Sequence, residues 1–497
     1  MPLQLDWELD AGGRGPKQRG QHFVARRAPT LTVAEAVSVA RAKAPIAANA
    51  APQRTGLGRS FNLLLGAGTV SSLGDGLAFV GFPLLASTLT HSPGLIAGVA
   101  IATRLPWLLV ALPFGALADR VDRRRLLGII EIGRMLVLLL LGLSIATHSV
   151  DLLQLYAAAF VLGSFETGFA ATTQALLPEL LPADQLAKGN GRLFAAQMTG
   201  EQFAGPALGG VTFAFAAALP FVADGITFAA SAALLMLALP RGRAVSSAAA
   251  QPAVAAASIR RSLIAEVREG VSWLAKHRTL RLVAVMIATF AFCQTMGLAI
   301  LVVYGLRVLH LTGTAFGLFV AGGATGNVIG ALGAHRIVRR LGTGRVLIFA
   351  GLLGGAAFAA VGLTSMLGVA LTAFVLEAVA VGVGNVATLA LRQSVIPGEL
   401  AGRVNSALRM CIYGAAAIGG VVGGVLATTV GVHTPFLVGG IVQMTAGLVI
   451  GVPIARRLAS TGEAAEPAVD LLEVEEWVNE GAEAPAPVLS LVSSDVA

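Results

Sequence analysis

The sequence predicts an all-α, polytopic membrane protein with twelve transmembrane helices in two six-helix halves. Of the 497 residues, 56% are hydrophobic and only 12% are charged, whereas a water-soluble domain usually carries about a quarter charged residues. Apolar runs of about twenty residues or more, which is enough to cross a bilayer as a helix, recur along the chain. Basic residues gather in alternate connecting loops, which is the asymmetry that orients membrane helices.

The first predicted half, residues 60–239, contains six apolar segments. It follows residues 1–59, which carry nine basic and four acidic residues and lack a long periodic apolar face. We expect this stretch to be a mostly disordered, basic cytoplasmic extension. The six expected spans are Phe61–Leu89, Ser92–Ala118, Leu126–Ala146, Leu152–Leu177, Gly191–Ala214 and Leu219–Leu239.

A basic linker, residues 240–279, separates the two halves. It holds seven Lys and Arg residues and an amphipathic piece, Ile264–Lys276, which predicts a short helix at the membrane surface. The second half, residues 280–457, is followed by an acidic cytoplasmic tail, residues 458–497. Its expected spans are Leu280–Val303, Ala315–Val338, Val346–Ser365, Leu367–Leu391, Ser406–Val430 and Pro435–Ala455.

The basic residues predict the orientation of the chain. On one face of the predicted bundle, Arg307 is the only Lys or Arg residue in the loops. The loops of the other face contain all the arginine clusters. Positively charged loops stay in the cytoplasm. Both termini are therefore predicted to be cytoplasmic.

The two predicted halves repeat at a constant offset of 215 residues. Chance produces some matches in a chain rich in Gly and Ala, but a constant offset across separate loops favours a duplicated unit. The matched pairs are Gly115 and Gly330, Arg124 and Arg339, Pro182 and Pro397, Asn190 and Asn405, Gly205 and Gly420, and Gly209 and Gly424.

The loop between the second and third spans carries the most specific motif. Its simplest interpretation is a positively charged cytoplasmic loop. The order Gly-x-x-x-Asp-Arg-x-x-Arg-Arg, however, resembles the signature loop of the major facilitator superfamily, with Asp122 where the superfamily pattern usually has Gly. The resemblance implies a cytoplasmic gate in which the acid of this loop meets the start of the eleventh span. The implied gate residues are Gly115, Asp119, Arg120, Arg123, Arg124 and Arg403.

A second motif lies in the fifth span. Small residues there allow neighbouring helices to approach closely, and a proline can bend the helix. Ordinary tight packing accounts for such a pattern. The sequence also resembles the Gly-Pro-x-x-Gly-Gly signature of superfamily exporters that exchange substrate for protons, carried here by Gly205, Pro206, Gly209 and Gly210. The segments around Asp75 and Asn190, the arginine-rich loop and Gly402-Arg403-Val404 resemble the branch of bacterial macrolide and siderophore exporters, which implies a location in the inner (plasma) membrane of a bacterium.

Ionisable and polar residues inside the apolar runs are candidate coupling residues. A charge at the middle of a membrane helix costs about 2.5–3.5 kcal/mol on insertion scales, so such residues usually have a partner or a function. The superfamily resemblance places helices one, four, seven and ten around a central cavity. The candidates are Asp75, Arg104, Glu166, Glu201, Gln294 and Glu377.

Depth along the helices suggests partners for some of these groups. Asp75 and Arg104 lie at similar depths, so we expect an ion pair that either couples transport to protons or simply holds two helices together. Glu131 and Arg134 are expected to form a pair within one helix, since they lie one turn apart. Asp224, near the outer end of the sixth span, is expected to reach the membrane interface.

The sequence predicts a secondary transporter and not an enzyme. It lacks a phosphate-binding loop of the Gly-x-x-x-x-Gly-Lys-Ser/Thr type, its histidines are scattered, and its two cysteines imply no disulfide framework. We expect no cofactor, no metal site and no nucleic-acid partner. The favoured function is proton-coupled efflux of amphipathic drug-like or natural-product molecules by a monomer in the bilayer. The alternatives are an importer with the same fold, a non-transporting membrane scaffold and an integral membrane enzyme.

Overall fold

The computed structural model describes residues 57–110, 114, 117, 121–182, 185–238, 269–397 and 400–461. Within these ranges the secondary structure is helical, joined by short turns and loops. The predicted basic extension up to residue 56, the linker up to residue 268 and the acidic tail after Thr461 lie outside the described residues. Residues 269–276, at the end of the predicted linker helix, are helical.

The first half begins with long helices whose boundaries follow the local sequence. The Asp122 carboxylate accepts a hydrogen bond of 3.1 Å from the Arg125 backbone N–H, which caps the third helix of this half. Asp151 caps the next helix in the same way, at 2.7 Å from the Gln154 N–H. The helices are α2 (Arg59–Leu89), α3 (Pro93–Leu109), α5 (Arg123–Ala146), α6 (Leu152–Leu180), α7 (Leu186–Gln197), α8 (Gly205–Phe215) and α9 (Leu219–Ala238).

The segment between α7 and α8 is a π-helix, η2 (Met198–Ala204). Pro206 contributes to this irregularity, because proline lacks the backbone N–H that a regular helix needs at this position. Short π-helical segments inside α-helices are frequent at functional sites. The predicted fifth span is therefore present as three consecutive helical pieces.

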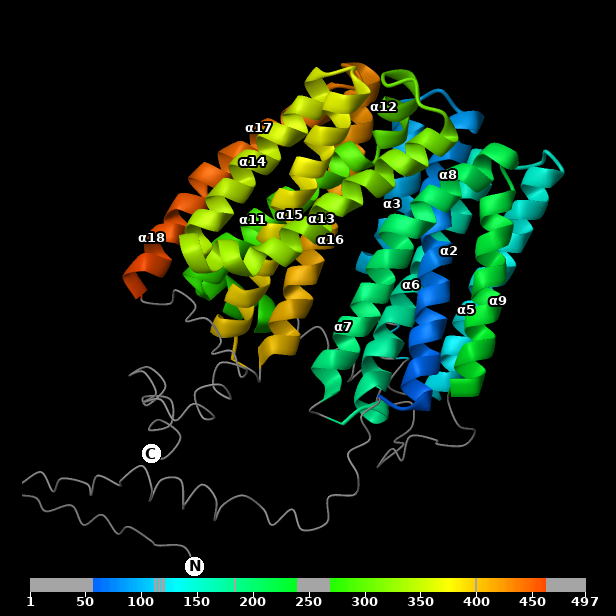
Figure 1. Cartoon of the computed structure of the whole chain (residues 1–497), viewed down its shortest axis with the longest axis horizontal. Helices are drawn as coiled ribbons and strands as arrows, with labels where there is room; N and C mark the ends of the chain where they lie inside the picture. The colour runs from blue at the N-terminus through cyan, green and yellow to red at the C-terminus, as the bar shows by residue number, and fades with distance from the viewer. Residues whose placement is uncertain are drawn as a thin grey trace, which may run out of the picture. The chain divides into compact units, whose positions relative to one another are not determined.

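The second half repeats this plan. Its helices are α11 (Arg278–Leu298), α12 (Leu301–Arg307), α13 (Gly313–Leu341), α14 (Thr343–Leu363), α15 (Leu367–Val395), α16 (Ala401–Thr429), α17 (Thr434–Val449) and α18 (Gly451–Thr461). The predicted offset of 215 residues recurs in the helix boundaries: α6 and α15 are related by it at both ends, α7 and α16 at their starts, and α9 and α17 at their starts. Figure 1 shows the helices of the two halves gathered into two groups.

Ten helical segments among the described residues are long and apolar enough to cross a membrane. The predicted second span is shorter, because α3 has 17 residues and the residues that follow it are only partly described. The predicted fifth span is broken by η2. The fold is thus all-helical and membrane-spanning, and the count of twelve spans stays a prediction.

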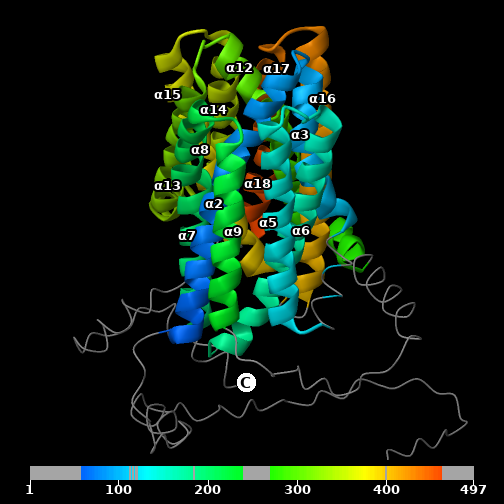
Figure 2. The ribbon, with the colours of Figure 1, turned by 90° about the vertical axis from the view of Figure 1, so that its right-hand side faces the viewer.

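Close helix contacts hold the first half together. Figure 2 shows α2, α9, α5 and α6 running side by side. At Gly74 of α2, a Cβ atom would lie 2.0 Å from the Asp224 carboxylate of α9. The absence of a side chain on Gly74 lets this carboxylate of α9 lie against α2.

The two halves are joined at the end that carries α12, which we call the outer end. The Arg307 guanidinium donates a 2.7 Å hydrogen bond to the His91 carbonyl, and the Gly94 N–H donates one of 2.9 Å to the Thr428 hydroxyl. Helix α3 packs along α16, and α8 packs along α13. Figure 1 shows the ribbons of the halves diverging towards the opposite, inner end, where the chain is predicted to face the cytoplasm.

Candidate functional site

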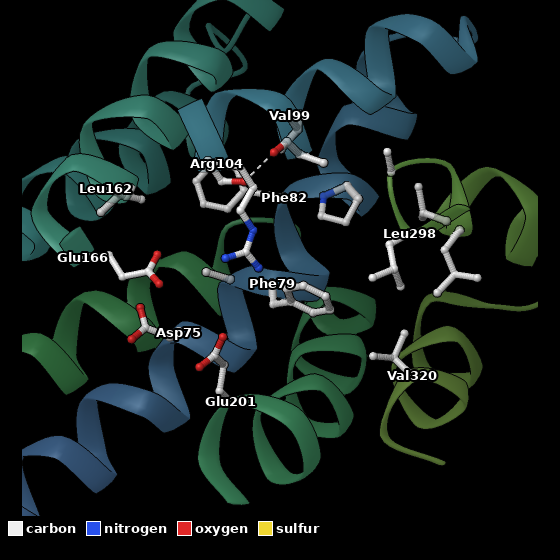
Figure 3. Close-up of a pocket in the computed structure, with 18 of the residues that line it drawn as sticks. Asp75, Phe79, Phe82, Val99, Arg104, Leu162, Glu166, Glu201, Leu298 and Val320 are labelled. Carbon is white, nitrogen blue, oxygen red and sulfur yellow. Dashed lines mark hydrogen bonds between the residues drawn. The ribbon is translucent and has the colours of Figure 1, made fainter. Parts of the chain in front are cut away.

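A cavity lies between the halves and holds ionisable side chains from six helical segments. Four are carboxylates and two are guanidinium groups, so acids outnumber bases. Figure 3 shows Asp75, Glu166 and Glu201 grouped near the Arg104 guanidinium, with Leu298 and Val320 across the cavity. The six ionisable residues are Asp75, Arg104, Arg134, Glu166, Glu201 and Asp224.

Asp75 pairs with Arg134, not with Arg104 as predicted. The Arg134 Nη2 atom donates to the Asp75 carboxylate at 2.5 Å, and Nη1 lies 3.4 Å from the Ser71 hydroxyl. The guanidinium carbon is 4.1 Å from the centre of the Phe228 ring, a cation–π contact. The prediction failed because equal depth does not place two side chains on facing sides of their helices.

Arg104 remains in the cavity without an ion pair shorter than 4.0 Å to any described residue. Its charge acts on Glu201 and on Tyr413 of α16. One turn further along α3, Trp107 stacks on Tyr413 with ring centres 4.8 Å apart. Arg104 therefore lies where the first half meets α16, next to the acidic side chains of the cavity.

Asp224 is buried in the bundle and does not reach the membrane interface, so the prediction made for this residue is wrong. Its exposed fraction is 1%, and its carboxylate accepts a hydrogen bond of 3.2 Å from the Thr227 hydroxyl. The missing side chain at Gly74 creates the space for it. Gly74, next to Asp75, was the signal for this space in the sequence. The sequence of α2 alone could not show that Asp224 of α9 fills it.

The predicted ion pair between Glu131 and Arg134 is also absent. Glu131 is fully buried, and neither of its carboxylate oxygens has a hydrogen-bond partner. Arg134 turns instead towards Asp75, on a different helix. Tertiary contacts decide between two acids that both lie within reach of one arginine.

The other acids of the first half are held differently. Glu201 lies in the π-helix η2, where the Gln197 amide donates to it at 3.2 Å. Glu166 of α6 lines the cavity and makes no ion pair shorter than 4.0 Å with a described residue. Both side chains are partly buried, so they face the same cavity as Asp75.

The candidates of the second half form a separate polar pair. The Gln294 amide of α11 donates a 2.7 Å hydrogen bond to the Glu377 carboxylate of α15. Glu377 has an exposed fraction of 2%, and neither residue lines the cavity described above. A contribution of these two groups to the central cavity stays a prediction.

The Gly-Pro-x-x-Gly-Gly segment forms close backbone contacts on two sides. A Cβ atom on Gly205 would lie 2.4 Å from the Gly76 Cα of α2, and one on Gly209 would lie 2.7 Å from the Leu77 carbonyl oxygen. A Cβ atom on Gly210 would lie 2.4 Å from the Gly313 carbonyl oxygen of α13. The motif thus joins Asp75's helix to the second half, next to the buried Pro206.

Part of the predicted gate lies outside the described residues, namely Gly115, Asp119 and Arg120. The two arginines that follow bind within their own half. Arg123 donates to the Ala175 carbonyl at 3.1 Å and also pairs with Glu179, and Arg124 donates to the Met236 carbonyl at 2.6 Å.

Arg403 pairs with Glu269 of the linker at 2.9 Å. Its predicted contact with the loop of the first half therefore stays a prediction. The linker helix packs tightly here, because a Cβ atom on Gly270 would lie 2.4 Å from the Arg403 carbonyl oxygen.

The cavity combines this charge with apolar walls. It encloses about 1270 Å³ of empty space, part of it open to solvent. Among the described residues, no group of three or more His, Cys, Asp or Glu side chains is arranged to hold a metal ion. The apolar lining comes from both halves and includes Phe79, Phe82, Ile96, Val99, Leu162, Phe228, Leu298, Val302, Phe316 and Val320.

This fold and cavity define a class: a multi-pass helical membrane protein whose two related halves enclose a charged site. The family model of the Major Facilitator Superfamily matches residues 64–420. The chain therefore belongs to the Major Facilitator Superfamily and is a membrane transporter of small molecules, not an enzyme.

Known proteins resemble this chain over most of its length, in sequence or in fold. An uncharacterized MFS-type transporter of Bacillus subtilis (strain 168), YfiS, is 28% identical over 406 residues, covering 79% of this chain and 93% of YfiS. The inward-facing structure of a bacterial homologue of the iron transporter ferroportin has a TM-score of 0.62 and 18% identity, covering 80% of this chain and 98% of that one. A POT family transporter in complex with a conjugated peptide has a TM-score of 0.61 and 14% identity, covering 78% and 95%.

Proposed function

We propose that the chain is a proton-coupled exporter of amphipathic drug-like or natural-product molecules in a bacterial plasma membrane. The observation that carries the proposal is the excess of carboxylates in the cavity, four against two guanidinium groups. Buried charges in a membrane protein need partners of opposite sign. The four carboxylates exceed the two guanidinium groups by two negative charges, so the site would bind protons or a cation to balance its charge.

The walls of the cavity support the substrate class. Ligand pockets are lined mostly by apolar side chains with a few polar groups that orient the ligand, and the lining of this cavity has the same character. Aliphatic side chains such as Leu298 and Val320 would contact an apolar body, while the acids lie on the other side of the space. Substrate and protons would then compete for the same carboxylates.

Asp75 is the proposed coupling residue. In the present conformation it is bound to Arg134 and is also part of the cavity lining. Protonation of Asp75 would release the arginine, and loss of the proton would restore the pair. Alternating access of the cavity to the two sides of the membrane would convert this exchange into substrate movement.

Inverted membrane vesicles provide the test. An imposed proton gradient should drive accumulation of a fluorescent lipophilic cation and of a macrolide in vesicles containing the wild-type chain. Asp75→Asn should reduce gradient-driven accumulation at least tenfold, because the amide cannot carry the proton. Asp151→Asn is the matched control: Asp151 is an exposed helix cap, and Asn caps helices equally well.

Three results would contradict the proposal. Wild-type accumulation that is independent of the gradient would remove proton coupling. Gradient-driven movement only in the opposite direction would favour an importer. Full activity of Asp75→Asn would remove Asp75 from the coupling mechanism.

A further inference from the structure

Glu131 is a fully buried acid that the proposed mechanism does not use. Its exposed fraction is 0%, and both carboxylate oxygens lack a hydrogen-bond partner. Ser231 of α9 is close enough to influence Glu131, yet its hydroxyl also makes no hydrogen bond. An ionised carboxylate left in this state would be strongly destabilising.

A basic partner is available one helical turn away. Arg134 lies three residues after Glu131 on α5, and side chains at this spacing are neighbours on the helix surface. Its Nε atom is buried and makes no hydrogen bond, while its Nη atoms bind Asp75 and lie at 3.4 Å from Ser71. A change of partner requires a rotation of the arginine side chain and the loss of its contacts with Asp75 and the Phe228 ring.

We propose that Arg134 exchanges its ion pair between Asp75 and Glu131 during the transport cycle. The proposal rests on the proposed proton coupling for its role in transport. When Arg134 binds Asp75, as here, Glu131 carries the proton. When Arg134 binds Glu131, the O–H bond of Glu131 breaks and an O–H bond forms on Asp75, which lines the cavity.

This exchange keeps the charge of the buried group constant. Two acids, one guanidinium and one proton sum to zero net charge in either arrangement, so no unpaired charge is left in the membrane. Other ionisable groups also act on Arg134 or on the two acids, and these come from the neighbouring elements α9, α6 and η2: Asp224, Glu166 and Glu201. Asp224 is therefore the competing acid that an experiment must separate.

Infrared spectroscopy can test the exchange without a transport measurement. The full-length chain, with ¹³C-labelled glutamate, is reconstituted in lipid, and the C=O stretch of protonated glutamic acids is separated from that of aspartic acids by the label. The wild type should show a protonated-glutamate signal that is lost in Glu131→Gln. In Asp75→Asn the same signal should be lost although Glu131 is intact, because Arg134 then binds Glu131.

Asp224→Asn is the matched control and should keep the Glu131 signal. Persistence of the signal in Asp75→Asn, or no signal dependent on Glu131 in the wild type, would overturn the proposal. Loss of the signal in Asp224→Asn would also overturn the proposal, because Arg134 would then exchange with Asp224 as readily as with Asp75. A single thermal unfolding transition checks that each variant is folded.

The outcome is separable from that of the vesicle assay. Gradient-independent transport together with an intact exchange would remove the proposed function alone. Proton-driven transport together with an unchanged signal in Asp75→Asn would remove the exchange alone.

Discussion

At the residue scale, the ion pair of Asp75 and Arg134 sets the character of the cavity. The two residues are 59 positions apart in the chain, and the arginine is buried between α2 and the Phe228 ring of α9. Asp75 is less enclosed, with 30% of its side chain exposed. One end of the pair is therefore fixed in the bundle and the other end is open to the cavity, which suits an acid that exchanges protons with water.

Removing the arginine should destabilise the protein. Arg134→Gln leaves a carboxylate without its cation, and loss of one member of a buried pair costs about 3–5 kcal/mol. We expect a clear decrease in the thermal unfolding temperature of the purified protein. The double variant Asp75→Asn/Arg134→Gln should recover part of the loss.

Arg192→Gln, at an exposed position of α7, is the control and should unfold close to the wild-type temperature. Equal unfolding temperatures for Arg134→Gln and Arg192→Gln would contradict the structural importance of the pair. Additive losses in the double variant would show that the two side chains are not coupled.

At the element scale, the glycines of α8 allow two backbones to meet across the halves. A Cβ atom on Gly317 of α13 would lie 2.4 Å from the Pro206 carbonyl oxygen, and Gly210 meets Gly313 in the same way. The atoms in the way belong to backbone, which cannot move aside as a flexible side chain can. The motif that resembles an exporter signature is thus a helix-packing surface in this conformation, and its part in antiport stays a prediction.

Adding one methyl group to this surface should weaken the closed outer end. Gly210→Ala forces α8 away from α13, and overpacking of this kind costs typically about 1–3 kcal/mol. We expect a lower unfolding temperature and slower gradient-driven transport. Gly191→Ala in the same predicted span is the control.

A Cβ atom on Gly191 would meet nothing within 4 Å, so alanine there should be neutral or stabilising by up to about 1 kcal/mol through its higher helix propensity. A similar loss of stability in both variants would show that the substitution, and not the contact with α13, is responsible.

At the scale of the whole molecule, the contacts between the halves are concentrated along α3 with α16 and along α8 with α13. The Arg307–His91 and Gly94–Thr428 hydrogen bonds close the outer end. Each half, in contrast, is held by close helix packing of its own. A transport cycle that moves the halves as units must therefore break the contacts at the outer end.

Cross-linking this end should stop transport. In a chain with Cys293→Ala and Cys411→Ser, the pair Gly94→Cys and Thr428→Cys should form a disulfide, because a Cβ atom on Gly94 would lie 3.0 Å from the Thr428 hydroxyl. We expect oxidation to abolish gradient-driven uptake and a reductant to restore it.

The control cross-link joins two helices of one half. Gly384→Cys and Ala350→Cys lie on α15 and α14, and a Cβ atom on Gly384 would lie 3.6 Å from the Ala350 Cβ, a separation that a disulfide spans without strain. This bond should leave transport largely intact. Transport that continues with the Gly94–Thr428 positions cross-linked would contradict a rocking movement of the halves.

The class of the protein and most of its helix boundaries follow from the sequence alone. Long apolar runs have only one stable solution in a bilayer, the helix, because every backbone polar group must be satisfied internally. The offset of 215 residues between the halves is also visible in the sequence, because it compares residue types along the chain and needs no contacts. The boundaries of α6 and α15 follow it.

Only the tertiary structure decided which buried charges meet. Asp75 selects Arg134 over Arg104, Glu131 is left without its helical neighbour, and Asp224 enters the site through the space at Gly74. Depth along a helix is encoded in the sequence, but rotation about its axis and the choice of neighbouring helix are not. These are set by packing between segments that are distant in the chain, because the cost of burying a charge depends on all its neighbours.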